Sequence, residues 1–108
     1  MAQVDMSNGG RADRIRISPS QMKSVSKQFH IASEQSDRMV KDLDRQMEAM
    51  KAEWEGMTRQ TFVTQFEQWK KSMMNFTVLL NGIGVQLNGI AEKFEQAEEQ
   101  ARQIISKS

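Results

Sequence analysis

Two apolar stripes with the spacing of an α-helix meet at the midpoint of the sequence, at Trp54-Glu55-Gly56. With Ser36 as the exception, apolar residues recur every three or four positions from Met22 to Trp54, and again from Phe62 to Ile104. Such steps place side chains on one face of a helix. Gly56 lies between the stripes, and glycine adopts the left-handed conformation that ends a helix without a steric penalty. The sequence therefore predicts an all-α fold, an antiparallel helical hairpin with its turn at Trp54-Glu55-Gly56.

The order of the chain divides into an arm and one helical domain. We expect a flexible N-terminal arm over residues 1–16, because Asn8-Gly9-Gly10 favours a loop and no helical period surrounds it. Ser18, Pro19 and Gln21 are typical of a helix start: a capping serine, a proline at the first position and the glutamine of a capping box. Within a hairpin domain of residues 17–108, the first helix should span about 19–53, the turn 54–57 and the second helix about 58–105.

The composition excludes several classes of function. The 15 Lys and Arg residues balance 14 Asp and Glu residues, so the chain has no basic footprint for nucleic acid. The absence of cysteine excludes disulfides, thiolate metal sites and a cysteine nucleophile. His30, the one histidine, follows Phe29 off the stripe, which predicts an exposed residue that is neither a base nor a ligand. We expect no catalytic residue, no cofactor and no metal site.

Neither a membrane span nor a signal peptide is evident. The longest weakly polar run, residues 76–87, is interrupted by Asn81, Gly82, Gly84 and Gln86, which makes it too polar to span a bilayer. The first residues lack the apolar core of a signal peptide. If the protein is exported, we expect a route other than the general signal-peptide pathway.

The second half of the chain is apolar over a wider arc than the first half covers. An exposed apolar strip of this size marks an association face, and two hairpins that form a four-helix bundle bury both stripes. We predict a dimer, with a homodimer as the default of symmetry and a heterodimer with a related helical protein as the alternative. The seam of the core and dimer should contain Phe29, Leu43, Phe62, Phe66, Trp69, Phe76, Leu80, Ile83, Leu87 and Ile90.

Three glycines lie inside the second predicted helix, where each costs about 1 kcal/mol relative to alanine. These are Gly82, Gly84 and Gly89. Two interpretations stay open: the helix bends there, or another helix packs closely against it. Gly84 and Ala91 continue a strip of small residues beside the main stripe, which favours close packing.

These residues resemble the WXG family, the small Esx proteins exported by the bacterial type VII secretion system. The resemblance covers about residues 15–105. It implies hairpins that pair as four-helix bundles, export from the bacterial cytoplasm without a cleavable signal peptide, and contact with the membrane ATPase of the secretion system. It rests on Trp54-Glu55-Gly56 at the turn, on Ile17-Ser18-Pro19 at the helix start, and on Phe29, Phe62, Phe66 and Trp69.

The resemblance also implies an export signal near the C-terminus. Family members carry a tyrosine followed four residues later by an acid; here Phe94 and Glu98 hold these positions, and the chain has no tyrosine. A looser family pattern fits Phe94, Glu98, Ala101 and Ile105. Residues four apart project from one side of a helix, and an apolar anchor with one charge suits docking into a partner's groove. In an antiparallel dimer, Trp54 of one chain would lie near Phe94 and Glu98 of the other.

Three hypotheses of function follow. The first is a small secreted substrate of the type VII system that acts through protein–protein contacts. The second is a helical chaperone or adaptor that pairs with a larger type VII toxin and delivers it for export. The third is a membrane-active helix that uses residues 78–87.

Overall fold

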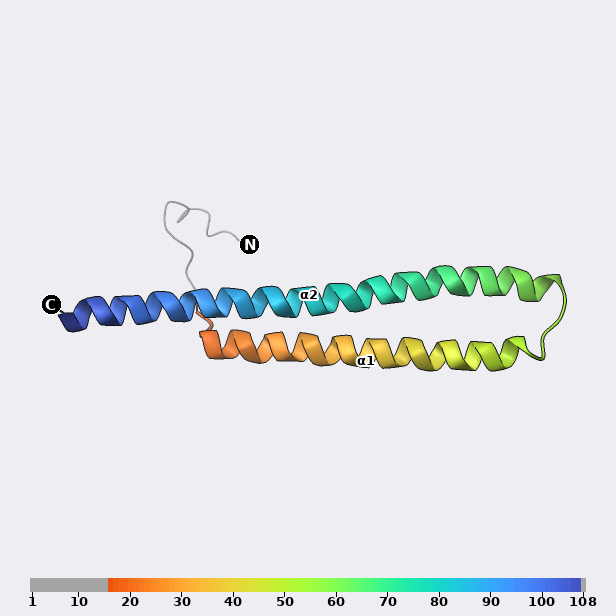
Figure 1. Cartoon of the computed structure of the whole chain (residues 1–108), viewed down its shortest axis with the longest axis horizontal. Coiled ribbons are helices and arrows are strands. Elements are labelled where there is room, and N and C mark those ends of the chain that lie inside the picture. The colour runs from red at the N-terminus through yellow and green to blue at the C-terminus, as the bar shows by residue number, and fades with distance from the viewer. Residues whose placement is uncertain (1–15, 108) are drawn as a thin grey trace.

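The computed structural model describes residues 16–107 and contains two helices, α1 (Pro19–Lys51) and α2 (Met57–Lys107). They lie side by side in opposite directions, and the end of α2 extends past the start of α1 (Figure 1). This confirms the predicted all-α hairpin. Helix α1 ends two residues before the expected bound, whereas α2 begins one residue earlier and ends two residues later than expected. The expected arm of residues 1–16 lies outside the described residues except for Arg16.

The start of α1 is fixed by the capping pattern visible in the sequence. The backbone N–H of Gln21 donates to the hydroxyl of Ser18 at 3.1 Å, and the backbone N–H of Ser18 donates to Oε1 of Gln21 at 2.8 Å. Pro19 occupies the first helical position. Together these satisfy two backbone donors that a helix start leaves without an intrahelical partner.

Helices α1 and α2 contact each other through small and polar residues. The hydroxyl of Ser26 donates to the carbonyl oxygen of Gly84 at 2.6 Å, and that of Ser33 donates to the carbonyl oxygen of Thr77 at 3.0 Å. Both serines are buried, and so are Gly84 and Ala91 of α2. The contact between the helices therefore includes the strip of small residues, alongside the buried Met22, Val40 and Met47 of α1.

Close packing explains one of the three glycines of α2. A Cβ atom at Gly84 would lie 3.0 Å from the carbonyl oxygen of Ser26 and from two ring atoms of His30, so a side chain does not fit there without a shift. Helix α2 is continuous through all three glycines. Gly82 and Gly89 have nothing within 4 Å of such a Cβ. Of the two interpretations, close packing is confirmed at Gly84.

The environment of His30 differs from the sequence expectation. Its Nδ1 lies 2.8 Å from Oδ1 of Asn81 on α2, and its ring lies beside Gly84. The residue is half-buried, so the prediction of an exposed surface histidine was wrong. The physical reason is that Gly84 has no side chain, which leaves space for the imidazole between the helices.

We call the ten residues predicted as a seam the apolar face of the hairpin; their spacing places the members from each helix on one side of that helix. None of the ten is buried within the chain: Trp69 is 52% exposed, Phe76 54% and Leu43 38%. In a single hairpin the seam residues are half-buried or exposed, and the buried positions are Met22, Ser26, Ser33, Val40, Met47, Gly84 and Ala91. The contribution of the seam to a dimer stays a prediction.

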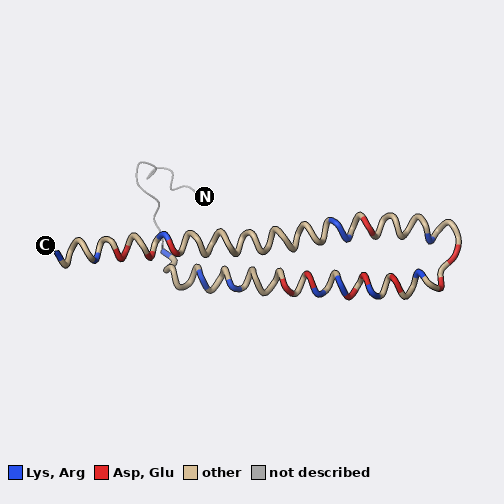
Figure 2. The backbone as a smooth tube through the Cα atoms, viewed as in Figure 1, with Lys and Arg blue, Asp and Glu red and all other residues tan. Residues whose placement is uncertain are grey.

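Charge is distributed unevenly along α2. Residues 72–91 contain no charged side chain, and Figure 2 shows this uncharged stretch beside α1. Among residues 16–107, no helix is long and apolar enough to cross a membrane.

Candidate interaction sites

The bend is bordered by an aromatic row that leads onto the apolar face. The ring centroids of Trp54 and Phe62 are 5.5 Å apart, and those of Phe62 and Trp69 are 5.8 Å apart in an edge-to-face arrangement. The indole N–H of Trp54 donates to the hydroxyl of Thr58 at 3.3 Å. Such ring pairs add to the energy of apolar burial. Trp54 is half-buried, so part of its ring remains available to another molecule.

Gly56 has the backbone conformation that the turn motif requires. Its φ is +105°, and every non-glycine residue in the described part of the chain has a negative φ. A side chain at such a φ is strained. The glycine of Trp54-Glu55-Gly56 is therefore explained by the turn itself. Glu55, which lies between Trp54 and Gly56, is exposed.

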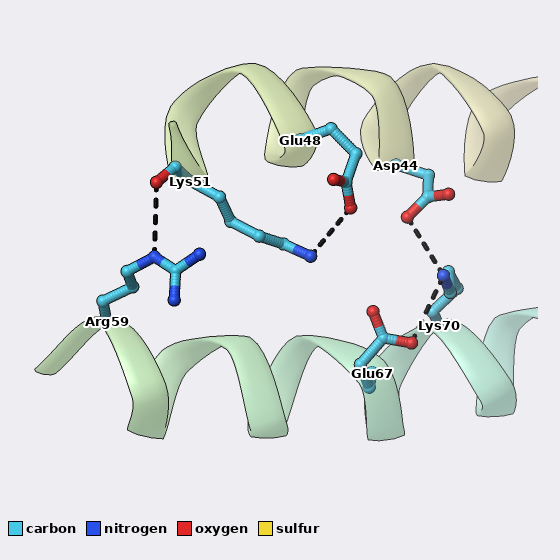
Figure 3. Close-up of polar contacts among 6 residues, drawn as sticks. All are labelled: Asp44, Glu48, Lys51, Arg59, Glu67 and Lys70. Carbon is cyan, nitrogen blue, oxygen red and sulfur yellow. Dashed lines mark hydrogen bonds and ion pairs between the residues drawn. The ribbon is translucent and has the colours of Figure 1, made fainter. Parts of the chain in front are cut away.

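Polar contacts tie the two helices together near the bend, as Figure 3 shows. The Nε–H of Arg59 donates to the carbonyl oxygen of Lys51 at 3.2 Å, which joins the end of α1 to the first turns of α2. Lys70 pairs with Asp44 of α1 at 3.0 Å and with Glu67 of its own helix at 3.3 Å. The hydrogen bond to Asp44 raises the pKa of Lys70 above its ordinary value.

A second ion pair lies at the open end of the hairpin. Nζ of Lys23 lies 2.8 Å from Oε1 of Glu95, and this hydrogen bond raises the pKa of Lys23. Together with the contact between Lys51 and Arg59, it fixes which residues of α1 and α2 lie opposite each other. The two contacts join α1 and α2 near opposite ends of the hairpin.

The predicted export signal borders the start of α1. Phe94 and Glu98 line a hollow of about 300 Å³ together with the segment Arg16–Pro19 and with Gln21. Phe94 is half-buried and Glu98 is exposed. Ala101 and Ile105 are not among the residues that line it; both are exposed on the part of α2 that extends past α1.

The contribution of Arg16–Pro19 to this hollow was not predicted. The sequence feature that could have indicated it is the position of the turn, because residues at equal chain distances from the bend of a hairpin lie side by side. Ile17 precedes the turn motif by about as many residues as Phe94 follows it. The hollow therefore forms only when both helices are paired.

The turn motif and the export-signal residues lie at opposite ends of one chain. The 33 residues of α1 separate Trp54 from the hollow of Phe94 and Glu98, a distance of about 50 Å at the rise of an α-helix. A patch that combines these residues would therefore need a second chain. Within residues 16–107, no group of three or more His, Asp or Glu side chains is placed to hold a metal ion.

The chain is similar to a known protein family over most of its length. The model of the WXG100 family, described as proteins of 100 residues with WXG, matches residues 14–99. The chain belongs to the WXG100 family. Its Trp54-Glu55-Gly56 supplies the tripeptide for which the family is named.

Two relatives are similar to this chain over most of their own length. Protein YukE of Bacillus subtilis is 31% identical over 88 residues, which cover 82% of this WXG100 chain and 91% of YukE. The type VII secretion system extracellular protein A of Staphylococcus aureus is 30% identical over 86 residues, which cover 80% of the chain and 89% of that protein.

Solved structures of Esx proteins share the hairpin. EsxA of Geobacillus thermodenitrificans has a TM-score of 0.72 at 27% identity, covering 82% of the chain and 97% of that structure. The secreted protein EsxB of Bacillus anthracis has a TM-score of 0.70 at 28% identity, covering 74% and 86%. Pairing of this WXG100 hairpin into a four-helix bundle is consistent with these neighbours.

Proposed function

We propose that this WXG100 protein is a small substrate exported by a type VII secretion system, and that it acts through protein–protein contacts and not as an enzyme. The observation that carries the proposal is the similarity to type VII secretion system extracellular protein A over 80% of the chain. The protein in this proposal acts outside the cell that makes it. The protein leaves the bacterial cytoplasm without cleavage of a signal peptide.

The export signal in this proposal is formed by Phe94, Glu98, Ala101 and Ile105. The shared hollow supports the role of the first two, because an apolar ring and a carboxylate open onto one concave surface. Its recognition partner is the membrane ATPase of the secretion system. Ala101 and Ile105 extend the surface toward the C-terminal end of α2.

The exported form in this proposal is a dimer. A partner hairpin that covers the apolar face, with its bend at the opposite end, brings its Trp54 toward Phe94 and Glu98. The signal then includes residues of both chains, and the secretion machinery distinguishes paired hairpins from unpaired ones.

The test measures export in a bacterium that has a type VII system. The tagged protein is followed by immunoblot in medium and cells, with a cytoplasmic protein as lysis control, and the mass of the exported protein shows whether it is intact. Glu98→Ala should accumulate in cells. The matched control is Glu99→Ala, which removes the neighbouring carboxylate, one that pairs with Arg102 and does not line the hollow.

Retention of Glu98→Ala with normal export of Glu99→Ala would support the signal. Equal export of both variants would contradict the assignment of Glu98 and leave the substrate role intact. If the wild-type protein stays in cells whose secretion system exports other substrates, the proposal itself is wrong.

The uncovered apolar face also supports a second candidate, an adaptor that pairs with a larger type VII toxin. A helical region of the toxin would then occupy the face. Co-expression followed by size-exclusion chromatography separates the candidates. A mixed complex that replaces the homodimer would favour the adaptor, and a homodimer that persists with every toxin of the same bacterium would exclude it.

A further inference from the structure

The carboxylate of Glu98 lacks a cationic partner in the part of the chain that the structure describes. The two nearest carboxylates of α2 are paired: Glu95 binds Lys23 at 2.8 Å, and Glu99 binds Arg102 at 2.6 Å. Within residues 16–107, no ion pair or hydrogen bond joins the side chain of Glu98 to another residue. The open end of the hairpin therefore carries a negative charge that a cation from elsewhere can bind.

The hollow beside Glu98 combines this carboxylate with an aromatic wall. Phe94 lies one helical turn before Glu98, and both residues line the hollow of about 300 Å³. A guanidinium group suits both walls, because it stacks on aromatic faces and pairs with carboxylates through two parallel hydrogen bonds. The methylene groups of an arginine also cover apolar surface. The chemistry of the hollow therefore favours an arginine side chain as its occupant.

The chain itself carries arginines next to this hollow. Arg16 lines it, and Arg11 and Arg14 precede Arg16 in the sequence. Residues 1–15 lie outside the described residues, and the match to the WXG100 family model begins only at residue 14. Two residues of chain span at most about 7 Å, so Arg14 starts close enough to the hollow for its side chain to enter it.

The two segments that meet at the open end have opposite charge. Residues 92–99 of α2 contain four glutamates and one lysine, whereas residues 11–16 contain three arginines and one aspartate. Opposite charges attract over a Debye length of about 10 Å at moderate ionic strength. Because the arm is tethered to the hollow through Arg16, its effective concentration there is high. Charge and tethering together favour the chain's own arm over an occupant from another molecule.

We propose that Arg14 of the N-terminal arm binds in this hollow, with its guanidinium paired with Glu98 and stacked on Phe94. The arm then covers part of the export signal, and the membrane ATPase has to displace it to contact Glu98. The inference rests on the proposed function in taking Phe94 and Glu98 as part of that signal. It deepens the proposal by naming a segment of the chain that regulates access to the signal.

Trypsin tests the contact, because it cleaves after arginine in segments that are released from the folded protein. The cleavage rate follows the population in which Arg14 is released. Glu98→Ala should raise the rate of cleavage after Arg14 by roughly 2- to 5-fold, as for the loss of an exposed ion pair. The matched control is Glu99→Ala, because Glu99 pairs with Arg102 and does not line the hollow. Mass spectrometry quantifies the products, and circular dichroism compares the helicity of the variants.

A second measurement identifies the carboxylate that the arm contacts. Arg14→Lys keeps the positive charge and introduces an amine, which a carbodiimide joins to a carboxylate in direct contact with it. The expected product is a cross-link between positions 14 and 98 within one chain, which migrates as a monomer on a denaturing gel. Adding Glu98→Gln to Arg14→Lys removes the carboxylate and should abolish this product.

Faster cleavage of Glu98→Ala alone, together with the cross-link within one chain, would support the inference. Equal cleavage after Arg14 in the wild type and in Glu98→Ala would overturn it. A cross-link from position 14 only to other carboxylates would overturn it as well. Protection from trypsin that is lost on dilution, or a cross-link only between two chains, would assign the hollow to a second molecule and also overturn it.

The export assay separates this inference from the proposed function. Arg14→Ala should increase the exported fraction, because the ATPase then meets no competitor at Glu98; a smaller exported fraction would overturn the regulatory role of the arm. Wild-type protein retained in cells, with faster cleavage of Glu98→Ala, removes the proposed function alone. Normal wild-type export, with equal cleavage of the two proteins, removes the arm contact alone.

Discussion

The hydroxyl of Ser26 donates a 2.6 Å hydrogen bond to the carbonyl oxygen of Gly84, and no other residue type fits at position 84 without a shift of its neighbours. The carbonyl oxygen of Ser26 belongs to the backbone of α1 and cannot move freely, whereas the ring of His30 can rotate. Close approach of the two helices at this point therefore depends on the missing side chain.

Gly84→Ala should destabilise the folded protein by about 1–3 kcal/mol, the usual cost of an added methyl group in a packed site. Gly82→Ala and Gly89→Ala are matched controls. Both positions are open, so alanine there should stabilise the helix by about 0.5–1 kcal/mol. Urea denaturation at one fixed protein concentration measures all three. A stabilised Gly84→Ala would contradict the close contact.

Ser18→Ala should lower the free energy of unfolding by about 1 kcal/mol, because it removes the hydroxyl that caps α1. It should also loosen the rim of the hollow beside Phe94, which Ser18 lines. Ser20→Ala is the control, since Ser20 is exposed in the first turn and makes no part of the capping box. Thermal unfolding followed by circular dichroism gives the difference; equal midpoints for the two variants would refute the role of the cap.

The sequence was sufficient for features that depend on neighbouring residues. The capping box of Ser18 and Gln21 and the turn glycine Gly56 were predictable because each needs only local chemistry, and both occur in the structure. The family was predictable as well, since the tripeptide at the midpoint of two apolar stripes is a specific combination.

The sequence was insufficient where residues distant in the chain decide the packing. Periodicity showed an apolar stripe on each helix but not whether the stripes face each other or a partner; the structure places the strip of Ser26, Ser33 and Gly84 between the helices instead. His30 was misjudged for the same reason, because the space it occupies is created by a glycine on the other helix. The hollow at Phe94 likewise joins segments from both ends of the chain.

Lys70→Met should remove a contribution to the stability of the folded protein that the wild type loses at alkaline pH. The hydrogen bond to Asp44 raises the pKa of Lys70 above its ordinary value of 10.5, so the charged amine binds its proton more tightly in the folded state than in the unfolded state. The stabilisation is complete below pH 10.5 and is lost as the pH rises through the raised value.

The wild type should therefore lose stability more steeply than Lys70→Met as the pH rises above about 10. Lys71→Met is the control, because Lys71 is an exposed neighbour with the same charge. The absence of tyrosine removes one other group that titrates in this range. Parallel pH profiles for the wild type and Lys70→Met, measured by urea denaturation, would show that the pair with Asp44 does not form in solution.

Gly56→Ala should cost about 1–2 kcal/mol, because φ is +105° at this residue and an L-side chain is strained there. A Cβ atom at position 56 meets nothing within 4 Å, so the cost comes from the backbone alone and leaves the rings of Trp54 and Phe62 in place. Urea denaturation of Gly56→Ala measures this cost.

Trp54→Ala is the comparison, since it removes the ring contact and the hydrogen bond to Thr58 but leaves the turn conformation unchanged. If Gly56→Ala is exported normally at a temperature where it is folded, whereas Trp54→Ala is retained, the glycine forms the turn and the tryptophan is the part that the secretion machinery recognises. Retention of both folded variants would instead assign recognition to the geometry of the bend.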